Sequence, residues 1–224
     1  DRPEDAALVL NTPFSLIRTI GKNVFVIPNY MEATRLDEVY SPVRQSVADS
    51  VAAKKKNVVV MIVESFGSEY IGALNDYEGY TPFLDSLMRQ SYTFYNMYAN
   101  GRRSIQALPA VWSSIPSFKA PFVLMPQSVA TGRAMPHIFK EKGYETMFFC
   151  GSDHGSMGFG AYARAVGIDN LYSRQTYEKS RGKGDFDGYW GIWDGKFIDY
   201  MGEELSKVKQ PFFSTIFTLT SHHP

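Results

Sequence analysis

Residues 57–63, with the sequence NVVVMIV, constrain the fold more than any other stretch of the chain. These residues are mostly branched and apolar, without the period-2 alternation of a half-exposed strand. They predict a strand covered on both faces, as in a parallel sheet between helices. Glu64 follows directly. Because open α/β sheets bind ligands beyond the carboxyl ends of their strands, we expect residues 57–117 to carry half of an active site.

Strand and helix patterns alternate through the rest of the chain, which predicts βαβ units and a mostly parallel sheet sandwiched between helices. The fold class is therefore α/β. A helix is expected over 82–92, capped by Thr81 and with Phe83, Leu84, Leu87 and Met88 on one face, and another over 128–142, closed by Gly143. Shorter helices are expected over 161–166 and within 190–208. Strands are expected over 91–100, 144–150 and 211–221.

Composition excludes several classes of function. With 224 residues, of which 44% are hydrophobic, the chain can bury one sizeable core. Its 23 basic and 23 acidic residues cancel, so no nucleic-acid partner is expected. Cys150 is the only cysteine, which rules out an internal disulfide. No apolar run reaches the roughly 20 residues that a membrane-spanning helix needs.

Two segments differ in pattern. Residues 1–50 are polar and weakly periodic, and we expect a linker and short helices there that pack on a larger domain. Residues 51–224 are expected to form that domain. Within it, Asp187 and Asp194 are expected to cap turns or the following helix. Trp190 and Trp193 are expected to pack this helix onto the sheet.

Glu64 is a candidate metal ligand. Hard divalent cations prefer carboxylate oxygens, and a strand end holds such a side chain rigidly. The alternative is a carboxylate that caps the next turn, and position alone leaves both interpretations open.

Ser104 is a candidate nucleophile. It lies where the loop NGRR gives way to the helical sequence SIQALPAVW, so its hydroxyl can lie at the positive end of a helix. Arg102 and Arg103 stand beside it and could hold an anionic substrate. The alternative is an ordinary N-cap serine, which the position alone favours.

Several blocks together resemble one family: NVVVMIVESFGSEYIG, TPFLDSL, NMYANGRRSIQALPAVWSSIP, KGYETMFF, GSMGF and TLTSHHP. They resemble the lipoteichoic-acid-synthase-type branch of the sulfatase and alkaline-phosphatase superfamily, whose members are phosphoglycerol and related phosphoryl transferases. The resemblance runs in order from about Leu10 to the end of the chain. The opening LNTPFSLIRTIGKN resembles the segment that joins the family's membrane helices to its extracytoplasmic catalytic domain.

The resemblance implies a metal-dependent enzyme of the cell envelope. It implies that Glu64 ligates one divalent cation, Mn²⁺ before Mg²⁺ or Zn²⁺, and that Ser104 is both the nucleophile and a metal ligand. His222, in the block TLTSHHP, would contact the substrate phosphate. The implied partner is a lipid-linked phosphoglycerol or similar anionic substrate, and the implied location is the outer face of the cell membrane, reached through N-terminal membrane helices absent from this chain.

The chain departs from the family pattern after the strand expected at 144–150. A His-Gly pair is common there, followed by a Trp and an Arg that hold glycerol phosphate. Here Cys150 and Gly151 take the place of the pair, and Met157 and Phe159 the place of the Trp and Arg. Cys150 therefore occupies a substrate-binding position. His154 is the candidate that supplies the missing imidazole, with an ordinary loop histidine as the alternative.

A second departure concerns the metal. Family members complete the site with an Asp-His pair downstream of the block that here reads TLTSHHP. We therefore expect the domain to lack its C-terminal part and the fragment to be inactive. Asp153 and His154 resemble that pair, but their place in the order of blocks corresponds to the substrate loop.

Two other functions stay open. A true sulfatase needs a formylglycine formed within a C/S-x-P-x-R motif, and Ser104-Ile105-Gln106-Ala107-Leu108 lacks the Pro and the Arg. A catalytically silent module that binds anionic glycans or lipid head groups is the other alternative. An incomplete metal site would favour it, whereas the presence of both Glu64 and Ser104 argues against it.

Overall fold

The structure is a computed structural model that describes residues 13, 17, 20, 29–41 and 54–223. The chain divides into two units, residues 1–54 and 55–224, a few residues beyond the expected boundary. In the first unit, α3 (Ala33–Val39) is a short helix, as expected for this segment. The other elements expected within 1–50 lie outside the described residues, and their packing on a larger domain stays a prediction.

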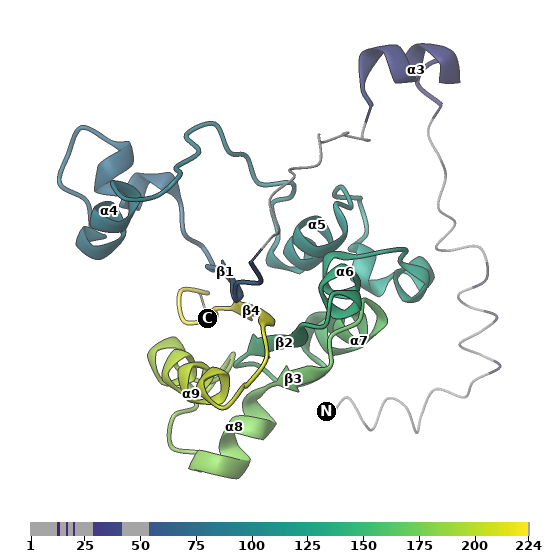
Figure 1. The fold of residues 1–224 in the computed structure, drawn as a ribbon. Coiled ribbons are helices and arrows are strands. Elements are labelled where there is room, and N and C mark those ends of the chain that lie inside the picture. The colour runs from purple at the N-terminus through teal and green to yellow at the C-terminus, as the bar shows by residue number, and fades with distance from the viewer. Residues whose placement is uncertain (1–12, 14–16, 18–19, 21–28, 42–53, 224) are drawn as a thin grey trace. The chain divides into compact units, whose positions relative to one another are not determined.

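A four-stranded parallel sheet forms the centre of the second unit (Figure 1). Its strands lie in the order β1, β4, β2, β3. Their bounds are Val58–Ile62 for β1, Glu145–Cys150 for β2, Asn170–Tyr172 for β3 and Phe212–Phe217 for β4. All neighbours run parallel, which confirms the predicted sheet and the strands predicted from 57, 144 and 211.

Helices cover both faces of the inner strands (Figure 1). On one face, Phe148, Phe213 and Phe217 join an apolar cluster with side chains from α5, α6 and α7. On the other face, Phe149 and Ile216 join a second cluster with side chains from α8 and α9. Every residue of β4 is buried, because it lies between β1 and β2 and under both helical layers. The α/β sandwich is therefore confirmed.

The helices have these bounds: α4 Pro82–Met88, α5 Ala107–Ser113, α6 Met135–Glu141, α7 Phe159–Ala165, α8 Arg174–Arg181 and α9 Asp194–Ser206. Short 3₁₀ helices lie between them: η1 Ser68–Tyr70, η2 Gly72–Leu74, η3 Ser104–Gln106, η4 Phe122–Leu124, η5 Pro126–Ala130 and η6 Ser156–Gly158. Gly143, predicted to close α6, has φ of +80°, a conformation that glycine adopts without strain.

One face of β1 is not covered by the residues that the structure describes, contrary to the prediction. Val58, Val60 and Ile62 pack on the first apolar cluster, whereas Val59 and Met61 are 47% and 54% exposed. The layer of α8 and α9 packs on side chains of β2, β4 and β3, and the cluster contains no residue of β1. A run of branched apolar residues shows that a strand favours burial, but not which element covers it.

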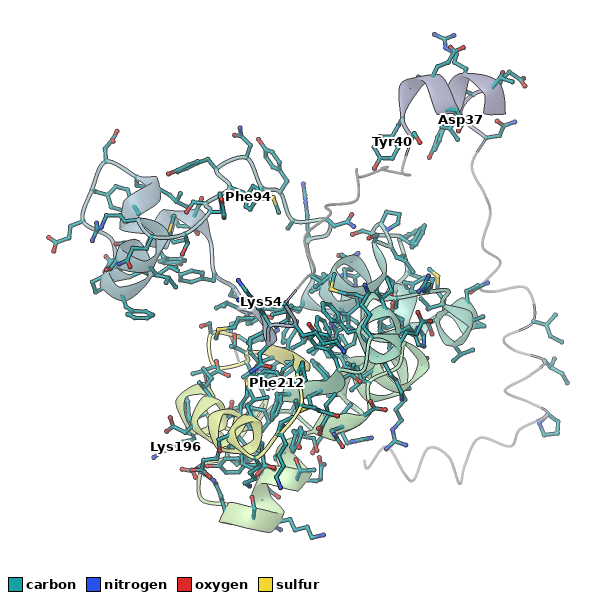
Figure 2. All side chains as sticks on the ribbon, in the orientation of Figure 1. Asp37, Tyr40, Lys54, Phe94, Lys196 and Phe212 are labelled. Atoms are coloured by element: carbon teal, nitrogen blue, oxygen red, sulfur yellow. The ribbon has the colours of Figure 1, made fainter. Side chains whose placement is uncertain are left out.

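Three helix and strand predictions were wrong in part. Residues 91–100 form an irregular segment, not a strand, in which Tyr92 is 99% exposed and Phe94 is exposed as well (Figure 2). The single helix predicted over 128–142 is two, η5 and α6, because Pro136 lies in the first turn of α6 and its ring does not fit a helix interior. Thr81 does not cap α4: its hydroxyl lies 3.0 Å from Asp85 Oδ1. Phe83 on α4 is exposed.

Within the described residues, no helix has both the length and the apolar character needed to cross a bilayer.

Trp112 connects α5 to the central strand. Its indole Nε1–H donates to Thr215 Oγ1 on β4 over 3.0 Å, and both side chains are buried. Its ring meets Phe148 of β2 edge to face at a centroid distance of 5.1 Å. The indole therefore combines large apolar burial with the partner that its N–H requires.

Trp112→Phe should lower the free energy of unfolding by about 2–4 kcal/mol, because it leaves a cavity and an unpaired Thr215 hydroxyl. Urea unfolding followed by circular dichroism measures this. Trp193→Phe is the matched control, since that ring is half exposed, and it should change stability by less than about 0.5 kcal/mol. Equal effects of the two substitutions would contradict the account of this contact.

Candidate active site

The loops after β1 and β4 are joined at the carboxyl edge of the sheet. The Thr218 N–H donates to the carbonyl of Ile62 over 3.1 Å, which continues the ladder between the strands. The Thr218 hydroxyl then accepts the Glu64 N–H over 2.9 Å. Thr218 therefore holds Glu64 beside the segment that leads to His222.

The Glu64 side chain is only 8% exposed at this edge. Its Oε1 accepts the Ser65 hydroxyl over 2.9 Å, and Ser65 adopts the left-handed conformation with φ of +49°. Within the described residues no backbone N–H donates to the carboxylate, so the alternative of a turn cap is not what the structure shows. Oε2 has no hydrogen-bond donor in that part of the chain.

The described residues hold no group of three or more His, Cys, Asp or Glu side chains that could bind a metal ion together. A buried carboxylate with an unoccupied oxygen fits a hard cation as one ligand. Glu64 thus fits a metal ion as one ligand, but the described part of the chain does not supply a complete set of ligands.

Ser104 is the first residue of η3, and Arg103 occupies the N-cap position before it. The Arg103 N–H donates to Gln106 Oε1 over 3.1 Å, so the side chain of Gln106 satisfies the helix start. The alternative interpretation of Ser104 as an N-cap is therefore wrong. Ser104 is half-buried, and its hydroxyl makes no hydrogen bond to Glu64 or His222.

A pocket of about 380 Å³ adjoins η3. Arg103 and Gln106, on either side of Ser104, line it together with Asn100 and the apolar side chains of Met97 and Val111. A guanidinium and an apolar wall in one pocket suit an amphipathic anion.

The two arginines differ in their contacts. Arg103 Nη2 donates to the carbonyl of Lys119 over 3.3 Å. Arg102 is exposed and makes no hydrogen bond or ion pair with any residue that the structure describes. Arg102 is therefore the freer of the two cations beside Ser104.

Cys150, at the end of β2, is 4% exposed and belongs to the first apolar cluster. Burial raises the pKa of its thiol, although the nearby Ser152 hydroxyl, 3.2 Å from the sulfur, lowers the pKa in part. The thiol is a neutral core group, which favours packing over the substrate contact implied by its position in the family pattern.

His154 lies in the loop after β2, and its backbone N–H donates to Gln175 Oε1 over 3.0 Å. Its exposed ring lies against Gly160. Asp153, the neighbouring carboxylate, accepts two hydrogen bonds from Arg174, of which the shorter is 2.6 Å, and one from Gln175. An ion pair thus occupies Asp153 Oδ1, which supports the placement of this pair outside the metal site.

The loop 187–192 lies on the loop after β2. Asp187 Oδ1 accepts the N–H groups of Tyr189, Trp190 and Gly191, which confirms it as a turn cap. A Cβ at Gly191 would stand 2.4 Å from the carbonyl oxygen of Gly151, so only glycine permits this close approach.

The predictions for Asp194, Trp190 and Trp193 were wrong. The Asp194 carboxylate does not cap its own helix but accepts the N–H groups of the distant residues Leu219 and Thr220, each over 2.8 Å. Trp190 and Trp193 are 39% and 49% exposed and do not pack α9 onto the sheet. Aromatic residues beside a helix suggest core packing, but these two lie where the loops meet solvent.

His222 is held from two sides. Its ring lies 4.1 Å from the Trp190 ring between centroids, and its Nδ1 lies 2.7 Å from the carbonyl oxygen of His223. Trp190 Nε1–H donates to the same carbonyl over 3.0 Å. Sequence analysis did not indicate Thr218 and suggested other roles for Trp190 and Asp194. The glycines beside Trp190 and the threonines of TLTSHHP are the signals that could have indicated loop contacts.

Comparisons with known proteins agree with this fold. The family model described as Sulfatase matches residues 56–224, and the chain therefore belongs to the sulfatase family. A solved structure of a protein in the alkaline phosphatase superfamily from Vibrio parahaemolyticus aligns with a TM-score of 0.68 and 30% identity, over 78% of this chain and 42% of that one.

Curated relatives carry transferase and synthase names. The lipoteichoic acid synthase-like YvgJ of Bacillus subtilis is 26% identical over 90% of this chain and 31% of its own length. Phosphoglycerol transferase I of Xanthomonas campestris pv. campestris is 23% identical over the same shares. The chain thus spans about a third of the length of these relatives.

Cys150 should resist thiol reagents in the folded protein. Its raised pKa lowers the thiolate fraction at pH 8, and burial blocks access. Reaction with Ellman's reagent should be at least 100-fold slower than in urea, where the thiol has an ordinary pKa. Similar rates in both solvents would show that Cys150 is accessible in the folded protein.

Proposed function

We propose that this protein is a metal-dependent phosphoryl transferase or phosphodiesterase of the cell envelope that transfers a phosphoglycerol-like group. Ser104 is its nucleophile. The observation that carries the proposal is the buried Glu64 carboxylate at the carboxyl edge of the sheet, joined through Thr218 to the segment of His222. Membership of the sulfatase family and relatives named for phosphoglycerol transfer and lipoteichoic acid synthesis support it.

Ser104 and its arginines account for substrate binding and attack. Arg102 and Arg103 pair with the phosphate oxygens, and the apolar wall of the adjoining pocket accepts the non-polar part of the donor. Ser104 Oγ attacks phosphorus and loses its proton while the donor's alcohol leaves with a proton. An acceptor hydroxyl or water then attacks the phospho-enzyme and restores the serine.

Glu64 and Ser104 would hold one divalent cation, for which Mn²⁺ is the first candidate and Mg²⁺ or Zn²⁺ are alternatives. The cation would stabilise an alkoxide and the charge on the phosphoryl oxygens. Carboxylate and hydroxyl oxygens suit Mn²⁺ and Mg²⁺. These two ligands alone leave most coordination positions to other groups.

His222 and His154 are the two histidines proposed to contact the substrate through their imidazole rings. His222 is better supported, because its ring is held in place and leaves Nε2 without a partner among the described residues. His154 lies in a separate exposed loop and is the weaker candidate. Cys150 is left out of the proposed contacts because it is buried.

The proposed donor is a lipid-linked phosphoglycerol or a similar anion, and the proposed location is the extracytoplasmic face of the cell membrane. The names of the relatives and the mixed polar and apolar pocket support this choice. A sulfate ester is a weaker candidate substrate, because the sequence after Ser104 lacks the Pro and Arg of the formylglycine motif.

Ser104→Ala should lower turnover of a chromogenic phosphodiester with Mn²⁺ by at least 1000-fold in the full-length protein, since no other group replaces the attacking oxygen. Ser206→Ala, at the end of α9, is the control and should retain wild-type turnover. Retained turnover in Ser104→Ala would remove this residue from the nucleophile role. Cleavage of the matching sulfate ester would favour a sulfatase instead, and no turnover of either ester by the wild type would favour a binding module.

Glu64→Gln should weaken Mn²⁺ binding by at least about 10-fold, since loss of a group that only supports a metal ligand already costs about 10- to 100-fold. Isothermal titration calorimetry measures the affinity. Glu78→Gln is the matched control, because that carboxylate is exposed and makes no hydrogen bond in the described part of the chain. An unchanged affinity in Glu64→Gln would make Glu64 a structural residue.

A further inference from the structure

We infer that Trp190 and Asp194 are positioning residues that fix the imidazole of His222 with its Nε2 directed to substrate. The inference rests on the proposed function, in which His222 contacts the substrate phosphate. Two sets of contacts carry it, one to the ring and one to the backbone of the same segment.

One nitrogen of the His222 ring and the indole nitrogen of Trp190 both bind the same carbonyl oxygen. The carbonyl of His223 lies 2.7 Å from His222 Nδ1 and 3.0 Å from Trp190 Nε1. A carbonyl only accepts hydrogen bonds, so Nδ1 carries the proton in this contact. The hydrogen bond of one ring nitrogen fixes the state of the other, and Nε2 is thus the nitrogen left for a ligand.

Trp190 holds this arrangement in two ways. Its indole N–H anchors the shared carbonyl, and its ring packs on the His222 ring at 4.1 Å between centroids. The backbone of Trp190 is itself fixed, because its N–H donates to Asp187 Oδ1 over 2.8 Å. Trp190 therefore fixes the imidazole of His222 relative to the turn that Asp187 stabilises.

Asp194 holds the backbone that precedes His222. Its two carboxylate oxygens accept the N–H groups of Leu219 and Thr220, and its own N–H donates to Thr220 Oγ1, all over 2.8 Å. The His222 N–H in turn donates to the carbonyl of Leu219 over 2.9 Å. Asp194 thus fixes Leu219 and Thr220, and the bond from the His222 N–H ties His222 to this fixed backbone.

Trp193 provides a matched comparison. It lies three residues after Trp190 and is exposed to a similar degree, but its ring makes no hydrogen bond or aromatic contact in the described part of the chain. If an exposed indole near these loops were enough to position His222, the two tryptophans would be equivalent. The contacts with His222 and His223 distinguish Trp190.

The first test is spectroscopic and independent of activity. In the purified protein with ¹⁵N-labelled histidine, His222 should show a ring protonated on Nδ1 under conditions where it is neutral. Trp190→Phe and Asp194→Asn should shift this signal toward a mixture of tautomers, whereas Trp193→Phe should leave it unchanged. A wild-type ring protonated on Nε2, or one insensitive to both substitutions, would overturn the inference. Circular dichroism checks that each variant is folded.

The second test is kinetic. Trp190→Phe and Asp194→Asn should each raise KM for the phosphodiester at least fivefold, with Mn²⁺ affinity unchanged, while Trp193→Phe should change KM less than twofold. An unchanged KM in both positioning variants would contradict the inference. Wild-type kinetics in His222→Ala would instead refute the proposed role of His222 and leave the spectroscopic result on Trp190 intact, so the two failures are distinguishable.

Discussion

The burial of β4 between two helical layers is the constraint on which the rest of the structure depends. Its side chains alternate between two apolar clusters, and its neighbours β1 and β2 pair with it along nearly its whole length. Thr215, a polar residue in this core, has its partner in Trp112. Because the strands are parallel, their carboxyl ends meet at one edge, and the loops that follow them come together there.

The candidate site is built from these loops together with the first residues of η3 and α9, Ser104 and Asp194. Thr218 joins the end of β4 to Glu64 after β1, and Asp194 holds the residues that follow Thr218. The contact of Gly191 with Gly151 brings the loop of Trp190 to the same edge. Rigid strands thus place the loops, and side-chain to backbone hydrogen bonds fix them, as the proposed alignment of a phosphoryl group would require.

Much of the fold could be predicted from the sequence, because apolar runs and glycine stops are local signals. The strands from 58, 145 and 212 and the end of α6 at Gly143 follow from such signals. Residues 91–100 show the limit: their aromatic residues have the composition of a strand, but no neighbouring strand pairs with them among the described residues. Pairing and cover depend on distant residues, which a local pattern does not contain.

For the candidate site, the sequence selects residues whose roles stay predictions. Glu64 and Ser104 could be selected because their residue types and positions suit metal binding and attack. The roles of Asp194 and Trp190 could not, because each acts through hydrogen bonds to residues about 25 or more positions away. A carboxylate before a helix resembles a cap in any sequence, and only the structure shows that Asp194 binds the segment after β4 instead.

The most direct test of the central claim is to trap the covalent intermediate. The full-length protein is incubated with Mn²⁺ and a phosphodiester donor, quenched in acid during turnover, digested and analysed by mass spectrometry. The account predicts a phosphoryl-containing adduct on the peptide that holds Ser104, located at Ser104 itself. Continuing turnover with no adduct, or with the adduct on another residue, would contradict it.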